Sequence, residues 1–465
     1  MDIATLSLRT QADLIASGAL SSEALVRHYL DMISKHNGEV NAIVQVARVE
    51  DLIAQAQAAD EKVRSGAPLG RLHGVPMTVK DMCKVAGFPC TMGTEGLTGF
   101  VAEEDATIVA RVKAQGAIIL GITNVPELLM AFETDNLIYG RTNHPLDSHL
   151  SPGGSSGGEA AAIASGCSPA GLGSDSMGSV RVPASMVGIA GLKVTQGRLP
   201  QTGRVPMEGA SLHVRSASYG PMGRYIDDVA LLLEIIAGPD GIDPNTMPVP
   251  VQDYQRCDIS TLDVAWYENN GWCDVQPEIV QALRRAVDTL APFVGSVTND
   301  APACLNKVKS LALEMIAFGA DGGQSWYQGA KLMGSKALSP LFEAFLESAS
   351  SCQLTVTELR GRLREWDQYN FAMQAFSQRY PITLCPVSAT TAQAHGHSVR
   401  QIDNYTFTMA YSLSGQPVAT VCIGKDNNGL PIGVQVVGQL WCEHQVLAVA
   451  SVLERAFAQS DAANS

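Results

Sequence analysis

The sequence predicts an α/β fold in which helices cover both faces of a β-sheet. Short apolar segments such as 74–80 and 117–122 are typical of buried strands, and they alternate with amphipathic helical patterns such as 21–36 and 105–116. Strands without a polar side are expected where helices pack on both faces of a sheet. Hydrophobic residues make up 46% of the 465 residues and charged residues only 17%, which indicates a globular chain.

The first helix is defined by its end signals. Ser21 or Ser22 provides an N-cap for a helix over residues 21–36, and Asn37 with Gly38 provides a stop signal. The apolar residues between them repeat at helical spacing, so one face of this helix is expected to pack on the core.

The C-terminal half combines helices with a hairpin. Residues 417–423 and 430–437 are expected to be strands joined by an Asp-Asn-Asn-Gly turn. Between 240 and 375 the patterns are mostly helical and show no clear strand, so we expect a helical insert over the sheet within one domain of residues 1–465. The last amphipathic helix precedes a tail, 459–465, that we expect to be disordered.

Charge and composition exclude several classes of protein. The formal net charge is −14 and no run of Lys or Arg occurs, so the chain lacks the basic footprint of a nucleic-acid binder. The N-terminus has no signal-peptide pattern, and no apolar run of about 18 residues occurs, so we expect a cytoplasmic protein without a membrane partner.

The metal-binding residue types do not form a recognisable site. The ten cysteines show no C-x-x-C pair, which predicts free thiols in a reducing compartment. His395 and His397 have no further ligand at metal-binding spacing, so we expect them in a loop. Neither a metal nor an organic cofactor is predicted.

The segment 151–158, Ser-Pro-Gly-Gly-Ser-Ser-Gly-Gly, places two hydroxyls between two pairs of glycines. A phosphate loop needs a lysine where Glu159 stands, and a carboxylate there repels phosphate. A linker does not fit, because structured segments are predicted on both sides. The motif G-x-S-x-G of α/β-hydrolases, with His444 as the base, requires a buried strand just before it, but residues 143–152 are polar and interrupted by proline.

The glycine-rich segment 151–158 belongs to a set of segments that are specific in combination. They are GVPMTVKD at 74–81, TNVPE at 123–127, PGGSSGGEAAAIASG at 152–166, GLGSDSMGSVRVPASMVGIAGLKVT at 171–195, GPMGRYIDDVALLLEIIAGPDGIDP at 220–244 and GLPIGVQVVG at 429–438. In this set the chain resembles the amidase signature family nearly end to end. The resemblance implies a large mixed β-sheet sandwiched between helices, and a hydrolase that cleaves C–N acyl bonds.

The resemblance also implies a catalytic triad of Lys80, Ser155 and Ser179, with Ser155 on a cis peptide bond. A serine hydroxyl needs a base, and no histidine is near either serine motif in the sequence. A lysine can act only when neutral, so its pKa must fall by roughly three units, which an apolar setting such as 74–79 favours. Asp81 should point to the opposite side of the strand from Lys80. Ser155 then relays the proton of the nucleophile Ser179 to Lys80.

The resemblance assigns the oxyanion hole to the backbone N–H groups of Ser176, Met177, Gly178 and Ser179. The family usually has Gly-Gly before the nucleophile, and this chain has Met-Gly. Two outcomes follow. Either the backbone at Met177 is one that any L-residue adopts and its side chain lines the pocket, or a positive φ there impairs the hole.

Four further residues are predicted to support the site. Gly154 relieves crowding beside Ser155, and Ser156 bonds the surrounding loop. Asp175 and Arg181 flank the nucleophile and are expected to form a buried ion pair that holds the turn.

Substrate preference is predicted from apolar residues of the insert and the site. Leu129, Met177, Phe318 and Trp326 are expected to form a pocket for an aryl or otherwise apolar group. The resemblance implies small-molecule amides, anilides or carbamates as substrates, with urethanase or esterase activity, in a monomer or homodimer. Two alternatives are the glutaminase subunit of a tRNA-dependent amidotransferase and a non-catalytic binding protein that retains the fold.

Overall fold

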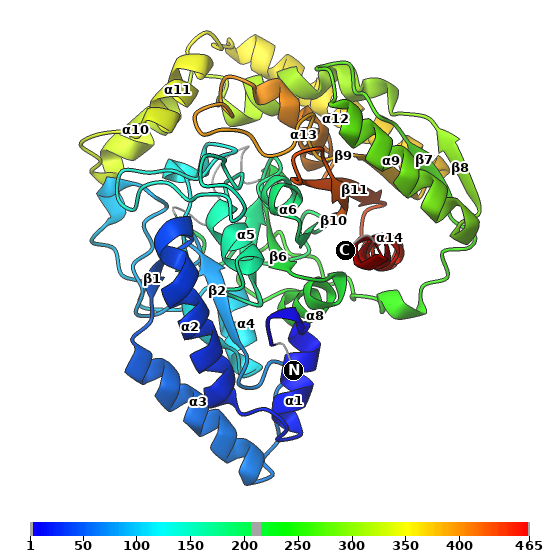
Figure 1. Cartoon of the computed structure of the whole chain (residues 1–465). Coiled ribbons are helices and arrows are strands. Elements are labelled where there is room, and N and C mark those ends of the chain that lie inside the picture. The colour runs from blue at the N-terminus through cyan, green and yellow to red at the C-terminus, as the bar shows by residue number, and fades with distance from the viewer. Residues whose placement is uncertain (1–2, 206–214, 464–465) are drawn as a thin grey trace.

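The centre of the computed structural model, which describes residues 3–205 and 215–463, is one mixed β-sheet (Figure 1). In this part of the chain the sheet has 11 strands in the order β1-β3-β2-β4-β6-β5-β10-β11-β9-β7-β8. The strands are β1 (Ile43–Val46), β2 (Pro76–Lys80), β3 (Ile118–Thr123), β4 (Ala170–Asp175), β5 (Ala190–Lys193), β6 (Ser218–Gly223), β7 (Asp263–Trp266), β8 (Ser296–Asn299), β9 (Ile382–Pro386), β10 (Val418–Lys425) and β11 (Pro431–Gly438).

Parallel pairing in the N-terminal half of the sheet positions the site. Strand β2 pairs in parallel with β3 on one side and with β4 on the other, and Val79 lies opposite Leu172. The carboxyl ends of β2 and β4 therefore meet at the same edge of the sheet, where ligands of α/β folds commonly bind. Lys80, a predicted catalytic residue, ends β2, and Asp175, a predicted supporting residue, ends β4, so both lie at this edge.

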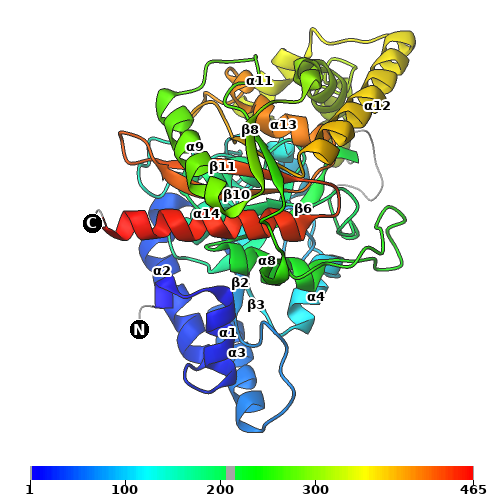
Figure 2. The same ribbon diagram turned by 90° about the vertical axis from the view of Figure 1, so that its right-hand side faces the viewer.

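Helices cover both faces of the sheet. Helices α2, α5 and α6 pack on one face, and Figure 2 shows α14 lying across the other face with α8 and α9 beside it. The helices are α1 (Leu8–Ala16), α2 (Ser22–Val40), α3 (Val49–Arg64), α4 (Thr107–Ala114), α5 (Gly157–Ala164), α6 (Arg181–Val187), α8 (Ile226–Ile236), α9 (Pro277–Leu290), α10 (Gln324–Met333), α11 (Pro340–Ala349), α12 (Val356–Arg379), α13 (Thr406–Leu413) and α14 (Glu443–Ala463).

Helix α2 begins where the sequence predicts and ends later. Ser21 caps it by accepting a hydrogen bond from Ala24 N, but the helix continues past Asn37 and Gly38 to its C-cap Asn41. The Asn37 side chain does not stop the helix, because its oxygen accepts the N–H groups that follow the helix, including that of Ala42 at 2.9 Å.

The segment 240–375 differs from the prediction because it contains two strands, β7 and β8. Both are four residues long and partly exposed, and β8 is the last strand of the sheet, so neither shows a continuous apolar run. The segment also contains loops, the helices α9, α10 and α11 and most of α12, and a π-helix, η7 (Lys309–Ala317), two of whose residues, Leu313 and Ala317, line the site.

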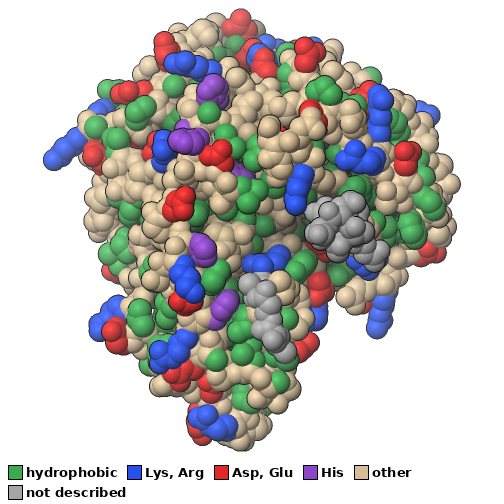
Figure 3. Space-filling model, viewed as in Figure 1, with side chains coloured by type: hydrophobic (Ala, Val, Ile, Leu, Met, Phe, Trp, Pro, Cys, Tyr) green, Lys and Arg blue, Asp and Glu red, His purple; other side chains and the backbone are tan. Residues whose placement is uncertain are grey.

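The C-terminal helix α14 continues to Ala463, into the segment 459–465 that the sequence predicted as a tail, and residues 464 and 465 lie outside the described residues. None of the described helices combines the length and the apolar character that crossing a membrane requires. All ten cysteines are free thiols. On the face seen in Figure 3, acidic and basic side chains are dispersed among one another.

Candidate active site

Lys80 is fully buried at the end of β2, and its ammonium nitrogen is surrounded by serine oxygens. Nζ lies 2.7 Å from Ser155 Oγ, 2.8 Å from Ser156 Oγ and 2.9 Å from Ser174 Oγ. No carboxylate of the described residues forms an ion pair with this lysine. The sequence did not single out Ser174, although it lies in the segment that carries the resemblance.

The pKa of Lys80 is lowered to about 7, mainly by burial and also by the charge of Arg204, while the charge of Asp175 partly opposes this. The neutral amine is therefore available near neutral pH, as the prediction of a lysine base requires. The carboxylate of Asp81 points elsewhere and accepts the Thr91 N–H at 2.7 Å.

A cis peptide bond joins Gly154 and Ser155, as the resemblance implies. A Cβ atom at Gly154 would stand 2.2 Å from the carbonyl oxygen of Glu133, so only glycine fits there. The neighbouring Ser156 is also buried, and its hydroxyl lies 3.2 Å from the carbonyl oxygen of Ser174 as well as accepting from Lys80. Both serines are thus held against the same lysine.

Ser179 lies in the turn between β4 and α6 and is 8% exposed. Its carbonyl oxygen accepts the N–H of Ser156 at 3.1 Å, which ties this turn to the cis-serine loop. Ser155 and Ser179 line one cavity. A bound substrate in that cavity would therefore meet both hydroxyls.

The ion pair predicted between Asp175 and Arg181 is present and fully buried. Arg181 Nη2 and Nε donate to the two carboxylate oxygens at 2.8 and 2.9 Å. Burial by itself raises the pKa of Asp175, but the charge and hydrogen bonds of Arg181 outweigh it and hold that pKa below its usual range. The Arg181 side chain also donates to Thr408 O and Gln435 Oε1, which anchors the turn to α13 and β11.

The backbone at Met177 does not have a positive φ, so any L-residue adopts this conformation. The methionine carbonyl accepts from Thr408 Oγ1 at 2.6 Å, and its side chain lines the cavity. Glycine is required one residue later, because Gly178 has φ +136° and a Cβ there would stand 2.4 Å from Thr408 Oγ1. The first of the two outcomes considered for Met177 therefore holds.

Not all four predicted oxyanion donors are available. The Gly178 N–H donates to Asp175 Oδ1 at 2.8 Å, so it is already paired inside the turn. The hydroxyl of Ser176 lies 3.0 Å from Ser216 Oγ, a contact that fixes its side chain and not its N–H group. Within the described residues, the N–H groups of Met177 and Ser179 have no recorded acceptor. Both N–H groups are therefore available as donors toward a substrate oxygen.

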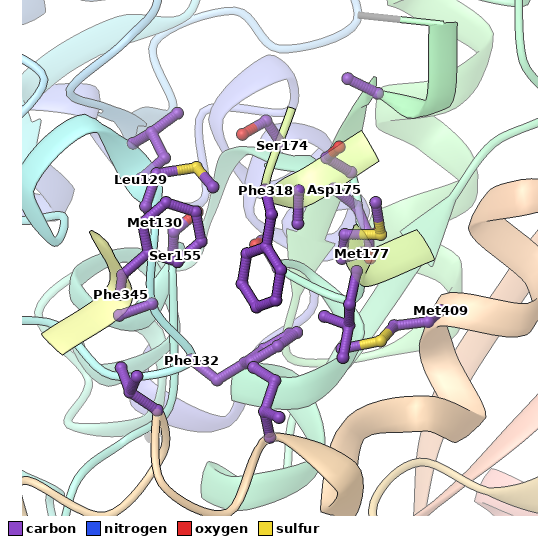
Figure 4. A pocket seen from close by; sticks show the side chains of 18 of the residues that line it. Leu129, Met130, Phe132, Ser155, Ser174, Asp175, Met177, Phe318, Phe345 and Met409 are labelled. Atoms are coloured by element: carbon purple, nitrogen blue, oxygen red, sulfur yellow. The ribbon is translucent and has the colours of Figure 1, made fainter. Parts of the chain in front are cut away.

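The cavity beside the serines has mostly apolar walls, and Figure 4 shows the Phe318 ring projecting into the space between Ser155 and Met177. Loop segments, the insert, the region before α13 and α13 itself all contribute apolar lining residues, among them Leu129, Met130, Phe132, Met177, Leu313, Ala317, Phe318, Phe345, Val399, Ile402 and Met409. Of these, the sequence predicted Leu129, Met177 and Phe318.

Trp326, also predicted to line the pocket, does not do so. Its indole Nε1 donates to Ala317 O at 2.8 Å, and its ring packs edge-on against Phe345 at 6.5 Å between centroids. The tryptophan therefore supports the wall from behind. Aromatic residues such as Phe132 and Phe345 were missed because helical spacing does not distinguish a core residue from a lining residue.

Comparison with known proteins shows which family this chain belongs to. The family model described as Amidase matches residues 24–447. The chain belongs to the amidase signature family. It is 31% identical over 96% of its length to the human protein fatty-acid amide hydrolase 2, covering 88% of that protein, and 31% identical to an acylamidase of Rhodococcus erythropolis, with 97% and 95% of the two chains covered.

A solved structure of 6-aminohexanoate cyclic dimer hydrolase with its substrate superimposes with a TM-score of 0.84 at 26% identity, over 98% of each chain. A glutamyl-tRNA(Gln) amidotransferase subunit from Gloeobacter violaceus is 30% identical, with 97% of this chain and 95% of that protein covered. This member of the amidase signature family is a hydrolase that cleaves C–N bonds of amides.

Proposed function

We propose that the enzyme hydrolyses its substrates through Ser179 as nucleophile, Ser155 as proton relay and Lys80 as base. The observation that carries this proposal is the contact of 2.7 Å between Lys80 Nζ and Ser155 Oγ, made by a fully buried lysine whose pKa is about 7. Both serines face the same cavity, so the relay leads from the buried base to the substrate.

The reaction proceeds in two stages. Neutral Lys80 takes the proton of Ser155 while Ser155 takes the proton of Ser179, and Ser179 Oγ attacks the carbonyl carbon. The same chain of hydroxyls then returns a proton to the leaving amine as the C–N bond breaks, which leaves an acyl-enzyme. Water attacks the ester carbonyl by the same relay and releases the acid and free Ser179.

The negative charge that develops on the carbonyl oxygen is stabilised by backbone N–H groups. Met177 and Ser179 supply the donors, since the Gly178 N–H is paired with Asp175. Removal of one such donor typically costs about 2.7 to 4 kcal/mol in transition-state stabilisation. The buried Asp175–Arg181 pair keeps the turn in place, so no donor has to reorganise when the charge forms.

The substrates we propose are small, mostly apolar amides, anilides and carbamates, with esters as a further class. This rests on the apolar cavity, where rings such as Phe132, Phe318 and Phe345 suit an aryl or alkyl group. A carbamate presents the same carbonyl to Ser179 and differs only in the atom that flanks it, so urethanase activity follows from the same site.

The two alternatives receive less support. A glutaminase needs a free carboxylate for the α-ammonium group of glutamine, and the one acidic residue that lines the described cavity, Asp175, is paired with Arg181. A non-catalytic protein was expected if Met177 distorted the oxyanion hole, and its φ is ordinary. We further propose a cytoplasmic monomer or homodimer, since ten free thiols suit a reducing compartment.

The test is release of 4-nitroaniline from matched N-hexanoyl and N-butoxycarbonyl 4-nitroanilides by the wild type and by Ser179→Ala. The wild type should turn over at least the amide, and S179A should lose the activity. Turnover by S179A equal to the wild type would reject Ser179 as nucleophile. The ratio between the two substrates measures the preference for carbamates.

A further inference from the structure

Arg204 places a guanidinium group in the wall of the active-site cavity. It is 7% exposed, and it lines the same cavity as Ser155 and Ser179. Its side chain makes one hydrogen bond with the described residues, from Nη1 to Gln201 Oε1 at 3.3 Å. No described carboxylate forms an ion pair with it.

Two other deeply buried arginines of the described residues have a carboxylate partner, which Arg204 lacks among these residues. Arg181 is paired with Asp175 through two nitrogens, and Arg198 is paired with Glu443 at 2.6 Å. A buried charge without a partner is costly, which is why buried arginines are normally paired. Arg204 therefore has the burial of these arginines without their counter-ion.

The neighbours of Arg204 do not supply a negative charge at neutral pH. Burial raises the pKa of the Cys83 thiol to about 12 and raises that of Tyr219 well above its usual value, so both groups are neutral. Burial also lowers the pKa of Arg204 itself, which shows how poorly its charge is solvated. Asp175 lines the same cavity, but its oxygens are occupied by Arg181 and the turn.

We propose that Arg204 binds a carboxylate of the substrate, so that the preferred substrates carry one carboxylate on a mostly apolar frame. This rests on the proposed function of the site. The planar guanidinium matches a carboxylate through two parallel hydrogen bonds, and such pairs are strongest in an apolar, water-poor setting. The described residues that line the cavity include no unpaired carboxylate for an ammonium group, so a carboxylate without an adjacent amine is expected.

The first experiment needs only the wild type and tests both sides of the scissile bond. The 4-nitroanilides of succinic, glutaric and adipic acid are compared with their methyl ketone isosteres, and hexanoyl 3-aminobenzoate is compared with hexanoyl 3-aminoacetophenone. At least one acid should exceed its neutral partner tenfold or more in kcat/KM, mainly through KM. If every neutral partner is cleaved as well as its acid, the proposal is rejected.

Hexanoyl 4-nitroanilide, which has no carboxylate, separates this outcome from failure of the proposed function. Cleavage of this compound without any preference for acids rejects the role of Arg204 alone. No cleavage of this compound or of any acid rejects the proposed function and this inference with it.

Variants assign the preference to the guanidinium. Arg204→Met should reduce the ratio of acid to neutral partner to one or less, and Arg204→Lys should keep part of it. Arg256→Met changes an arginine whose side chain is 88% exposed and should leave the ratio unchanged.

Glu208 lies in 206–214, outside the described residues, and a higher ratio in Glu208→Gln would mean that Glu208 is the counter-ion and would reject the proposal. If R204M does not fold, the wild-type ratio decides.

Discussion

Lys80 and Lys193 are both fully buried, and burial lowers the pKa of each to about 7. Their surroundings differ. Lys80 Nζ contacts the hydroxyl of Ser155, which lines the substrate cavity. Lys193 Nζ donates to the backbone carbonyl of Gln416 at 2.9 Å and has no place in the cavity wall.

In the proposed mechanism, a lysine with a pKa near 7 is not sufficient for catalysis. A base must also contact a group that carries the proton to the substrate, and only the serine loop around Lys80 provides one. Backbone carbonyls accept hydrogen bonds but relay no proton, so the surroundings of Lys193 hold strand β5 against the segment before β10. Both lysines thus have a pKa near 7, but only Lys80 of the two contacts a hydroxyl that lines the cavity.

The largest expected effect separates the two lysines by activity. Lys80→Met should lower kcat/KM by at least about 10³-fold, because Ser179 loses its base. Lys193→Met, the matched control, should stay within about fivefold of the wild type per folded molecule. Steady-state kinetics on hexanoyl 4-nitroanilide measure both, and equal losses in the two variants would show that the distinction is wrong.

The next effect separates two hydroxyls that contact the same amine. Ser155 and Ser156 lie 2.7 and 2.8 Å from Lys80 Nζ, but only Ser155 lines the cavity. Ser155→Ala should therefore lower kcat by about 10² to 10⁴-fold, and Ser156→Ala by no more than about tenfold. A larger loss in S156A than in S155A would assign the relay to the other serine.

The pH dependence of activity follows from the pKa of Lys80. The protonated amine cannot accept a proton, so kcat/KM should fall about tenfold per pH unit below about pH 7 and level off above it. K193M should keep this limb unchanged. An activity that is independent of pH between 5 and 8 would contradict a lysine base with this pKa.

The smallest expected effect concerns stability, where the two lysines should behave alike. In the folded state each releases its proton near pH 7, and in the unfolded chain each keeps it to about pH 10.5. The unfolded state therefore binds more protons between these values, so stability rises with pH. Each lysine contributes about 1.4 kcal/mol per pH unit between about pH 7.5 and 9.

Denaturant unfolding at several pH values measures this slope. Both K80M and K193M should lower it by the same share, in contrast to their unequal effects on activity. A slope that neither substitution changes would mean that these lysines stay protonated in the fold.

The residues proposed for catalysis could be singled out in the sequence because each lies in a local motif. Lys80 ends an apolar strand, and the glycine pairs around Ser155 allow the close approach to Glu133 that excludes any side chain at Gly154. Strands such as β2 and β4 were visible because they are continuously buried and therefore continuously apolar. Motifs and apolar strands are made of residues that are close together in the sequence, so the sequence shows them directly.

Long-range features were not predictable in the same way. Strands β7 and β8 are short and partly exposed, so pairing within the sheet decides their conformation: β7 pairs with β9, and β8 pairs with β7. Trp326 and Phe345 are both aromatic residues of the insert, and only their packing shows which one lines the cavity. The lack of a partner for Arg204 is likewise a property of the folded surroundings.

The most direct test of the central claim is the pH dependence of covalent labelling by a fluorophosphonate, with the labelled residue located by mass spectrometry. The account predicts one label, on Ser179, at a rate that rises with pH, levels off above about pH 7, and is lost in K80M but kept in K193M. A label on Ser155, or a labelling rate in K80M equal to that of the wild type, would contradict the account.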